Sequence, residues 1–204
     1  MKILGISCSP RENGNTVAML NESLKAAKTE GAEVELFSVA DKNIQLCDSC
    51  WRCWTPKRTG ICHIKDDIAV LIDKMIAADG IIFGVPVYFH TMSAQAKAIM
   101  DRTIALATPQ RNLINKVCGV VVSAGELGLV EVLKDFTYYI HVEHMLAANQ
   151  VSAYMNIKDD LERLPQCREE LRRLGKQMVA LVNMGFEFPR EYIGGVKTFG
   201  THNL

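Results

Sequence analysis

Four cysteines stand close together in the chain. Cys47, Cys50 and Cys53 follow one another at three-residue steps, and Cys62 comes after eight intervening residues. A CxxCxxC spacing can bring three thiolates round one polynuclear centre with a fourth ligand from elsewhere, which is typical of iron-sulfur ligation. Zinc sites more often combine two separated pairs of Cys or His. The spacing therefore favours an iron-sulfur cluster, with zinc or free thiols as the alternatives.

The composition is that of an ordinary globular protein. Of 204 residues, 49% are hydrophobic and 23% are charged, which suits one domain with a full core. The formal net charge is zero, so neither a nucleic acid nor an anionic membrane surface is expected as a partner. The N-terminus does not resemble a signal peptide and no apolar run has bilayer-spanning length, so we expect a cytoplasmic protein.

Strand-like and helix-like segments alternate along the chain, which is the pattern of a parallel sheet with helices on both faces. We expect an α/β fold, a flavodoxin-like doubly wound five-stranded parallel sheet, over residues 1–185, followed by an irregular tail over 186–204. The five strands are predicted at residues 2–7, 33–39, 80–85, 117–123 and 149–155. Helices are predicted between them and after the last one, where apolar residues recur at helical spacing.

A cysteine-rich insertion is predicted at residues 43–65. It lies where a short connection between the second strand and the next helix would normally lie. Sheets of this kind bind ligands at the carboxyl ends of their strands, near the point where the strand order reverses. The loops after the first, third and fourth strands should meet there.

The first of these loops has the residues of a phosphate site. It connects a strand to a helix N-terminus, which offers free backbone N–H groups and the positive end of the helix dipole. Ser9, Asn15 and Thr16 could add side-chain donors, and Arg11 could donate two hydrogen bonds to a phosphate. The alternative is a polar turn in which Asn13 or Asn15 caps the helix.

Other phosphate motifs are absent from this loop. It has neither a Walker ending nor a GxGxxG pattern. A phosphatase of this fold class would also place an arginine six positions after its cysteine, and the residue six after Cys8 is Gly14. We therefore expect Cys8 to be a packing residue.

Taken together, four segments resemble the NAD(P)H-dependent FMN reductase superfamily, and within it the iron-sulfur flavoproteins. They are the Ser-Pro-Arg…Gly-Asn-Thr loop, the Pro-Val-Tyr-Phe run at 86–89, Asp101-Arg102, and the cysteines before Asp66-Asp67. The resemblance covers residues 2–155. It implies bound FMN, flavin-dependent oxidoreductase activity and a homodimer or homotetramer.

The resemblance also implies which residues contact FMN. The first loop would hold the phosphate, and the loop after the third strand would lie along the isoalloxazine ring. The implied contacts are Ser9, Arg11, Asn13, Asn15, Thr16, Pro86, Val87, Tyr88, Phe89, Ser123 and Gly125. Tyr88 and Phe89 could instead be core aromatics, an interpretation that we favour for Phe89. Asp101 and Arg102 are expected to form a structural or interface pair.

The cysteine segment resembles the compact cluster motif of iron-sulfur flavoproteins, which implies a 4Fe-4S cluster on Cys47, Cys50, Cys53 and Cys62. Our leading hypothesis is an FMN oxidoreductase in which the flavin exchanges two electrons and the cluster passes them singly. NAD(P)H or a ferredoxin-like protein would be the donor. No catalytic acid, base or nucleophile is predicted.

Two other functions are also considered. One is an NAD(P)H-dependent FMN or quinone reductase whose cysteines are structural or bind zinc. The other is a flavodoxin-like electron carrier without turnover of its own.

Overall fold

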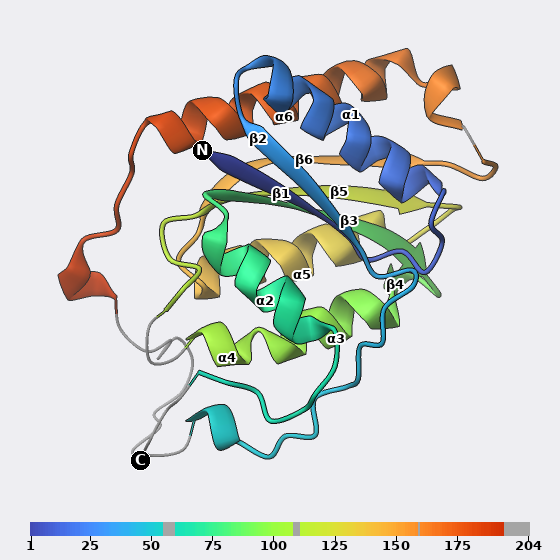
Figure 1. Ribbon diagram of the computed structural model, residues 1–204. Coiled ribbons are helices and arrows are strands. Elements are labelled where there is room, and N and C mark those ends of the chain that lie inside the picture. The colour runs from blue at the N-terminus through green and yellow to red at the C-terminus, as the bar shows by residue number, and fades with distance from the viewer. Residues whose placement is uncertain (55–59, 108–110, 159, 194–204) are drawn as a thin grey trace.

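A computed structural model describes residues 1–54, 60–107, 111–158 and 160–193. In these residues, five parallel strands form one sheet with helices on both faces (Figure 1). The strand order is β2-β1-β3-β5-β6, which confirms the flavodoxin-like fold class. The strands are β1 (Lys2–Ser7), β2 (Glu33–Ser38), β3 (Gly80–Tyr88), β5 (Val117–Ala124) and β6 (Leu146–Tyr154), and a short β4 (Thr91–Met92) pairs antiparallel with the end of β3.

The two central strands are apolar because helices cover both of their faces. Every residue of β5 is buried, and β3 is buried from Gly80 to Pro86. The register sets Gly84 beside Ser7 and Pro86 beside Ser123. The carboxyl ends of β1, β3 and β5 therefore meet at one edge of the sheet.

The helices form two layers, each with its own apolar cluster against the sheet (Figure 1). One layer contains α1 (Asn15–Thr29) and α6 (Pro165–Asn183), and the other contains α2 (Ile68–Ala77), α3 (Ala94–Arg102), α4 (Ile104–Ala107) and α5 (Leu129–Val142). Single 3-10 turns occur at η1 (Arg52–Trp54), η2 (Asp160–Arg163) and η3 (Arg190–Tyr192). Gly175 lets α6 approach α1 closely, since a Cβ there would lie 2.1 Å from the Ser23 carbonyl oxygen.

The segment after the third strand differs from its prediction. Residues 86–92 were expected to form a loop, but β3 continues to Tyr88 and the chain returns as β4. Phe89 and His90 form the turn with φ angles of 47° and 68°. Two-residue hairpin turns require such angles, usually supplied by Asn or Gly. The prediction was wrong because neither residue type marks this turn.

Two other segments bear on the predicted boundaries. In the described parts of residues 43–65, η1 is the one regular element, and the segment joins β2 to α2 as the insertion was expected to do. At the other end of the chain, the Phe188 N–H donates to Asn115 Oδ1 at 2.9 Å, so the start of the predicted tail contacts the domain. Residues 194–204 lie outside the described range. None of the described helices has the length and apolar character needed to cross a bilayer.

Glu143, just after α5, gives stability a predictable dependence on pH. It is 9% exposed, and burial, opposed by the charge of Arg111, raises the pKa of Glu143 from 4.5 to about 7. The native state therefore holds its proton to higher pH than the unfolded state does. The contribution of protonated Glu143 to the free energy of unfolding is fully present below pH 4.5, and it is lost as pH rises through about 7.

Glu143→Gln should remove that dependence. At pH 8 its free energy of unfolding should exceed that of the wild type by on the order of 2 kcal/mol, and the difference should shrink toward pH 4.5. Urea unfolding across this pH range measures it, with exposed Glu131→Gln on α5 as control. Parallel pH profiles for wild type and Glu143→Gln would contradict the assignment.

Candidate flavin and metal sites

A hollow opens at the carboxyl edge of the sheet, where the ends of β1, β3, β5 and β6 meet. Nine of the eleven predicted FMN contacts line it, so the three loops do converge. The lining residues are Ser9, Arg11, Gly14, Asn15, Thr16, Pro86, Val87, Tyr88, Ser123, Ala124, Gly125, Met155 and Asn156. Asn13 and Phe89 are not among them. Phe89 is 95% exposed at the hairpin turn, so its interpretation as a core aromatic was wrong.

The residues that follow the last strand, β6, also line this hollow, and they were not among the predicted contacts. Met155 and Asn156 follow β6, and a Cβ on Gly125 would lie 3.2 Å from Asn156 Oδ1. Because β6 is parallel to β5, its end lies at the same edge. The predicted parallel order of the strands could therefore have indicated that the loop after the last strand reaches the hollow.

The start of α1 is suited to an anion. Gly14 occupies the N-cap position, and no side chain there accepts a hydrogen bond from the first turn. The alternative in which Asn13 or Asn15 caps the helix was therefore wrong. Arg11 is the one charged residue among the described residues that line the hollow. Free N–H groups, the helix dipole and this cation all favour a phosphate.

Buried polar atoms beside this helix start support the same occupant. Thr16 Oγ1 and Ser123 Oγ are hydrogen-bonded at 2.8 Å, which links the first and third loops. The Asn15 amide donates to the Ile157 carbonyl oxygen at 2.8 Å. Its Oδ1 atom is buried and has no hydrogen-bond partner in the described part of the chain. A ligand hydroxyl could satisfy that oxygen, so the residues fit a phosphorylated polyol such as the FMN side chain.

Cys8 lies below the phosphate loop and is unsuited to nucleophilic chemistry. It is fully buried, and burial raises the pKa of its thiol to about 12. The Ser93 hydroxyl donates to the Cys8 carbonyl oxygen at 2.9 Å. Cys8 is thus a packing residue, as expected.

A second hollow lies beyond the C-terminal end of α3. All four predicted metal ligands, Cys47, Cys50, Cys53 and Cys62, line it. Burial raises the pKa of Cys53, and so do the charges of Cys62, Cys50 and Cys47, because the four sulfurs lie near one another. Thiolates so close together repel, and bound metal would relieve that repulsion. The donor set fits a thiolate-ligated metal centre.

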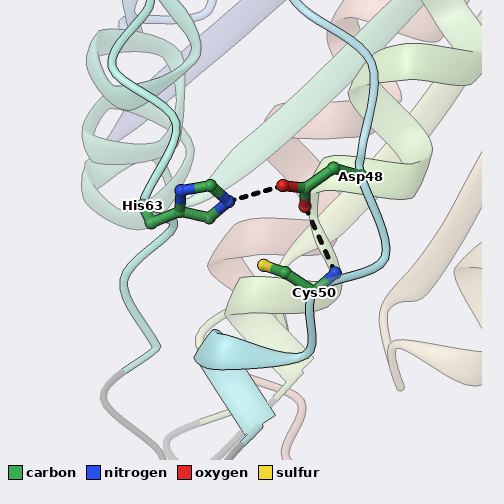
Figure 2. Close-up of side chains that lie close together, drawn as sticks. All are labelled: Asp48, Cys50 and His63. Carbon is green, nitrogen blue, oxygen red and sulfur yellow. Dashed lines mark hydrogen bonds and ion pairs between the residues drawn. The ribbon is translucent and has the colours of Figure 1, made fainter.

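Two other possible ligands, Asp48 and His63, meet Cys50 at the edge of this hollow (Figure 2). Asp48 Oδ2 and His63 Nε2 are 2.7 Å apart, and the Cys50 N–H donates to Asp48 Oδ1 at 3.2 Å. A hydrogen bond with the Cys50 thiol, and then that with His63, lowers the pKa of Asp48 to about 2. Within the described residues, Asp48, Cys50 and His63 are the one such set whose ligand atoms all lie within 4.8 Å.

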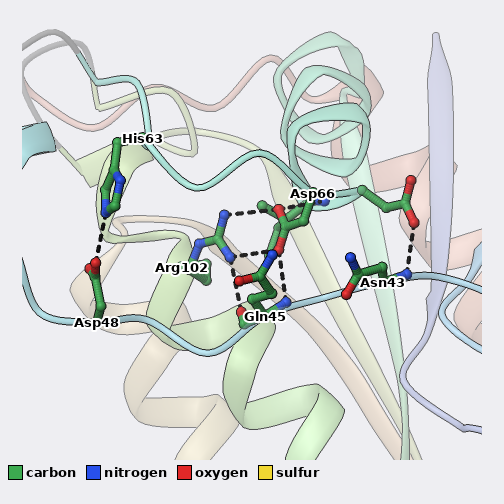
Figure 3. A network of polar contacts seen from close by, with 8 residues as sticks. Asn43, Gln45, Asp48, His63, Asp66 and Arg102 are labelled. Atoms are coloured by element: carbon green, nitrogen blue, oxygen red, sulfur yellow. Dashed lines mark hydrogen bonds and ion pairs between the residues drawn. The ribbon is translucent and has the colours of Figure 1, made fainter.

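A buried ion pair fixes the cysteine segment to α3 (Figure 3). Arg102 and Asp66 have side chains 1% and 0% exposed, with Nη1–Oδ2 and Nη2–Oδ1 distances of 2.9 and 3.0 Å. Arg102 also donates to the Gln45 carbonyl oxygen at 2.9 Å, and the Gln45 N–H donates to Asp66 at 2.8 Å. Asp101 instead pairs with Lys97 on the surface. The expected pairing of Asp101 with Arg102 was therefore wrong.

Comparison with known proteins shows the family to which the chain belongs. Residues 1–159 match the family described as NADPH-dependent FMN reductase. The chain belongs to this family. It is therefore an FMN-dependent redox protein, a flavin-dependent oxidoreductase.

Relatives of this FMN reductase family member include proteins named for two cofactors. An iron-sulfur flavoprotein of Methanocaldococcus jannaschii is 36% identical over 195 residues, which is 90% of this chain and 98% of that protein. An iron-sulfur flavoprotein of Methanosarcina thermophila is 32% identical over 160 residues, which is 77% of this chain and 82% of that one.

A solved structure shows the same fold at lower identity. It is RosB with a bound 8-demethyl-8-formylriboflavin-5′-phosphate intermediate, with a TM-score of 0.71, 19% identity, and coverage of 90% of this chain and 79% of that one. This likeness supports the flavodoxin-like fold of the family member.

Proposed function

We propose that this FMN reductase family member is an iron-sulfur flavoprotein, which passes electrons between a two-electron flavin and a one-electron 4Fe-4S cluster. The observation that carries the proposal is that Cys47, Cys50, Cys53 and Cys62 line one hollow at the end of α3. The names of the relatives at 36% and 32% identity give it further support.

For FMN, we propose the sheet-edge hollow as the site. Arg11 and the uncapped start of α1 would bind the phosphate. The hydrogen bond between Thr16 and Ser123 would hold the first and third loops together. Pro86, Val87 and Tyr88 line the other side of the hollow, where they could contact the ring and exclude water. FMN supplies the exchange of two electrons when it is bound. No residue of the chain then needs to act as a catalytic acid or base.

For the cluster, we propose the four cysteine thiolates as ligands. The Arg102–Asp66 pair and its contacts to Gln45 would hold the ligating segment in place. Zinc is the competing occupant, because Asp48, Cys50 and His63 bring three ligand atoms within 4.8 Å. The CxxCxxC spacing of the first three cysteines favours the cluster.

We also propose a homodimer or homotetramer, with NAD(P)H or a ferredoxin-like protein as electron donor and the cytoplasm as location. Support for association comes from exposed apolar side chains near the flavin hollow. Phe89, Leu127 and Val130 are 95%, 61% and 71% exposed. Leu127 and Val130 lie near the hairpin because Gly128 between them packs closely against it. A Cβ added to Gly128 would lie 2.6 Å from the His90 carbonyl oxygen. Sedimentation of the purified protein would measure its oligomeric state.

Metal analysis of anaerobically purified protein tests the cluster. We expect about four iron atoms and four sulfides per chain, as a 4Fe-4S centre contains. Cys50→Ser should lose most of both, whereas Cys167→Ser should keep them, because Cys167 lies on α6 and does not line the hollow. Zinc in place of iron and sulfide would contradict the proposal.

Arg11→Ala tests the flavin site. Loss of a charge-assisted hydrogen bond of about 1.5–3 kcal/mol should weaken FMN binding by about 10- to 100-fold without unfolding the protein, since Arg11 is exposed. Fluorescence titration of the apoprotein with FMN measures the dissociation constant. Arg173→Ala, at an exposed position on α6, is the matched control. Equal FMN affinity in Arg11→Ala and wild type would show that the phosphate binds elsewhere.

A further inference from the structure

One nitrogen of the Arg102 guanidinium, Nε, makes no hydrogen bond within the part of the chain that the structure describes. The two terminal nitrogens bind Asp66, and one of them also binds the Gln45 carbonyl oxygen. The Nε atom is buried and has no hydrogen-bond acceptor among the residues that the structure describes. A buried donor left unpaired costs about 1–3 kcal/mol, so this N–H calls for an acceptor.

The cysteine hollow is where that acceptor would lie. Arg102 lines this hollow together with Cys47, Cys50, Cys53 and Cys62, whereas Asp66 does not. Figure 3 shows the guanidinium with Asp66 on one side and the Asp48–His63 pair on the other. The ion pair is therefore a dipole with its positive end toward the thiolates.

Arg102 brings a positive charge into the wall of this hollow. Arginine keeps its proton at all ordinary pH values, and the two hydrogen bonds to the Asp66 carboxylate favour the charged form. It is a permanent, desolvated cation at the wall of the hollow.

We propose that Arg102 donates its Nε–H to a sulfur of the cluster or of a ligating thiolate and raises the reduction potential of the cluster. This inference rests on the proposed function. Reduction adds one negative charge to the cluster, and a nearby buried cation stabilises the reduced state more than the oxidised one. Hydrogen bonds to cluster sulfurs act in the same direction.

Other charges at this hollow are less suited to the role. Arg52 also lines it but is exposed, so water and salt screen its charge. His63 is paired with Asp48, which offsets any charge on the imidazole. Arg102 combines burial, a fixed orientation and a free donor.

An EPR-monitored redox titration of anaerobically purified protein tests the inference. Arg102→Met alone would leave the Asp66 carboxylate buried without its partner and could prevent folding. The variant of choice is therefore Arg102→Met with Asp66→Asn, which removes both charges. Iron and sulfide analysis gives the fraction of the variant that holds a cluster, and the potential is measured on that loaded fraction. The equilibrium constant for cluster reduction should fall at least tenfold, or about 59 mV for a one-electron couple.

Two single variants should change the equilibrium constant for cluster reduction in directions that a purely structural ion pair would not produce. Asp66→Asn alone leaves the cation unbalanced, so the equilibrium constant for cluster reduction should rise. Arg102→Lys keeps the charge but loses the Nε–H donor, so the constant should fall by less than in the double variant. Lys97→Met, on the exposed side of α3, is the control and should stay within twofold of wild type.

The possible failures are distinguishable. In the loaded double variant, the equilibrium constant for cluster reduction could stay within twofold of the wild-type value. That result would overturn the role of Arg102 while leaving the proposed function intact. A wild-type protein without iron and sulfide would overturn the proposed function, and the role of Arg102 with it. A flavin potential that shifts as much as the cluster potential would also count against a local effect of Arg102.

Discussion

The buried ion pair between Arg102 and Asp66 is the interaction on which the place of the cysteine hollow in the fold depends. Two fully desolvated charges are stable only when they meet with good geometry, and this pair does so through two hydrogen bonds. Arg102 ends α3, Asp66 leads into α2, and Gln45 at the entry to the cysteine segment bonds to both. Gln45 and Asp66, which flank the cysteine segment, are therefore both held at the end of α3.

Helix α3 in turn sets the relation of the two hollows. It begins after Ser93, which bonds to Cys8 under the phosphate loop, and it ends at Arg102 beside the cysteines. Its nine residues span about 14 Å. One rigid element thus connects the flavin edge of the sheet to the metal-ligand segment, and the sheet register fixes where that element starts.

Most of the fold and the position of the flavin site could be predicted from the sequence. The strands β3 and β5 are continuous apolar runs between turn residues, and their parallel order brings Ser9, Pro86 and Ser123 to one edge. The hairpin turn at Phe89 could not be predicted, because no Gly or Asn marks it. The partner of Arg102 was also hidden, since Asp66 lies 36 residues away while Asp101 is adjacent in the sequence.

The proposed function requires one chain to hold both a two-electron and a one-electron centre. An anaerobic reductive titration that counts electrons tests this most directly. We expect about three electrons per chain, two for the flavin and one for the cluster, and about two after Cys50→Ser removes the cluster. A wild-type protein with bound FMN that accepts only two electrons would contradict it.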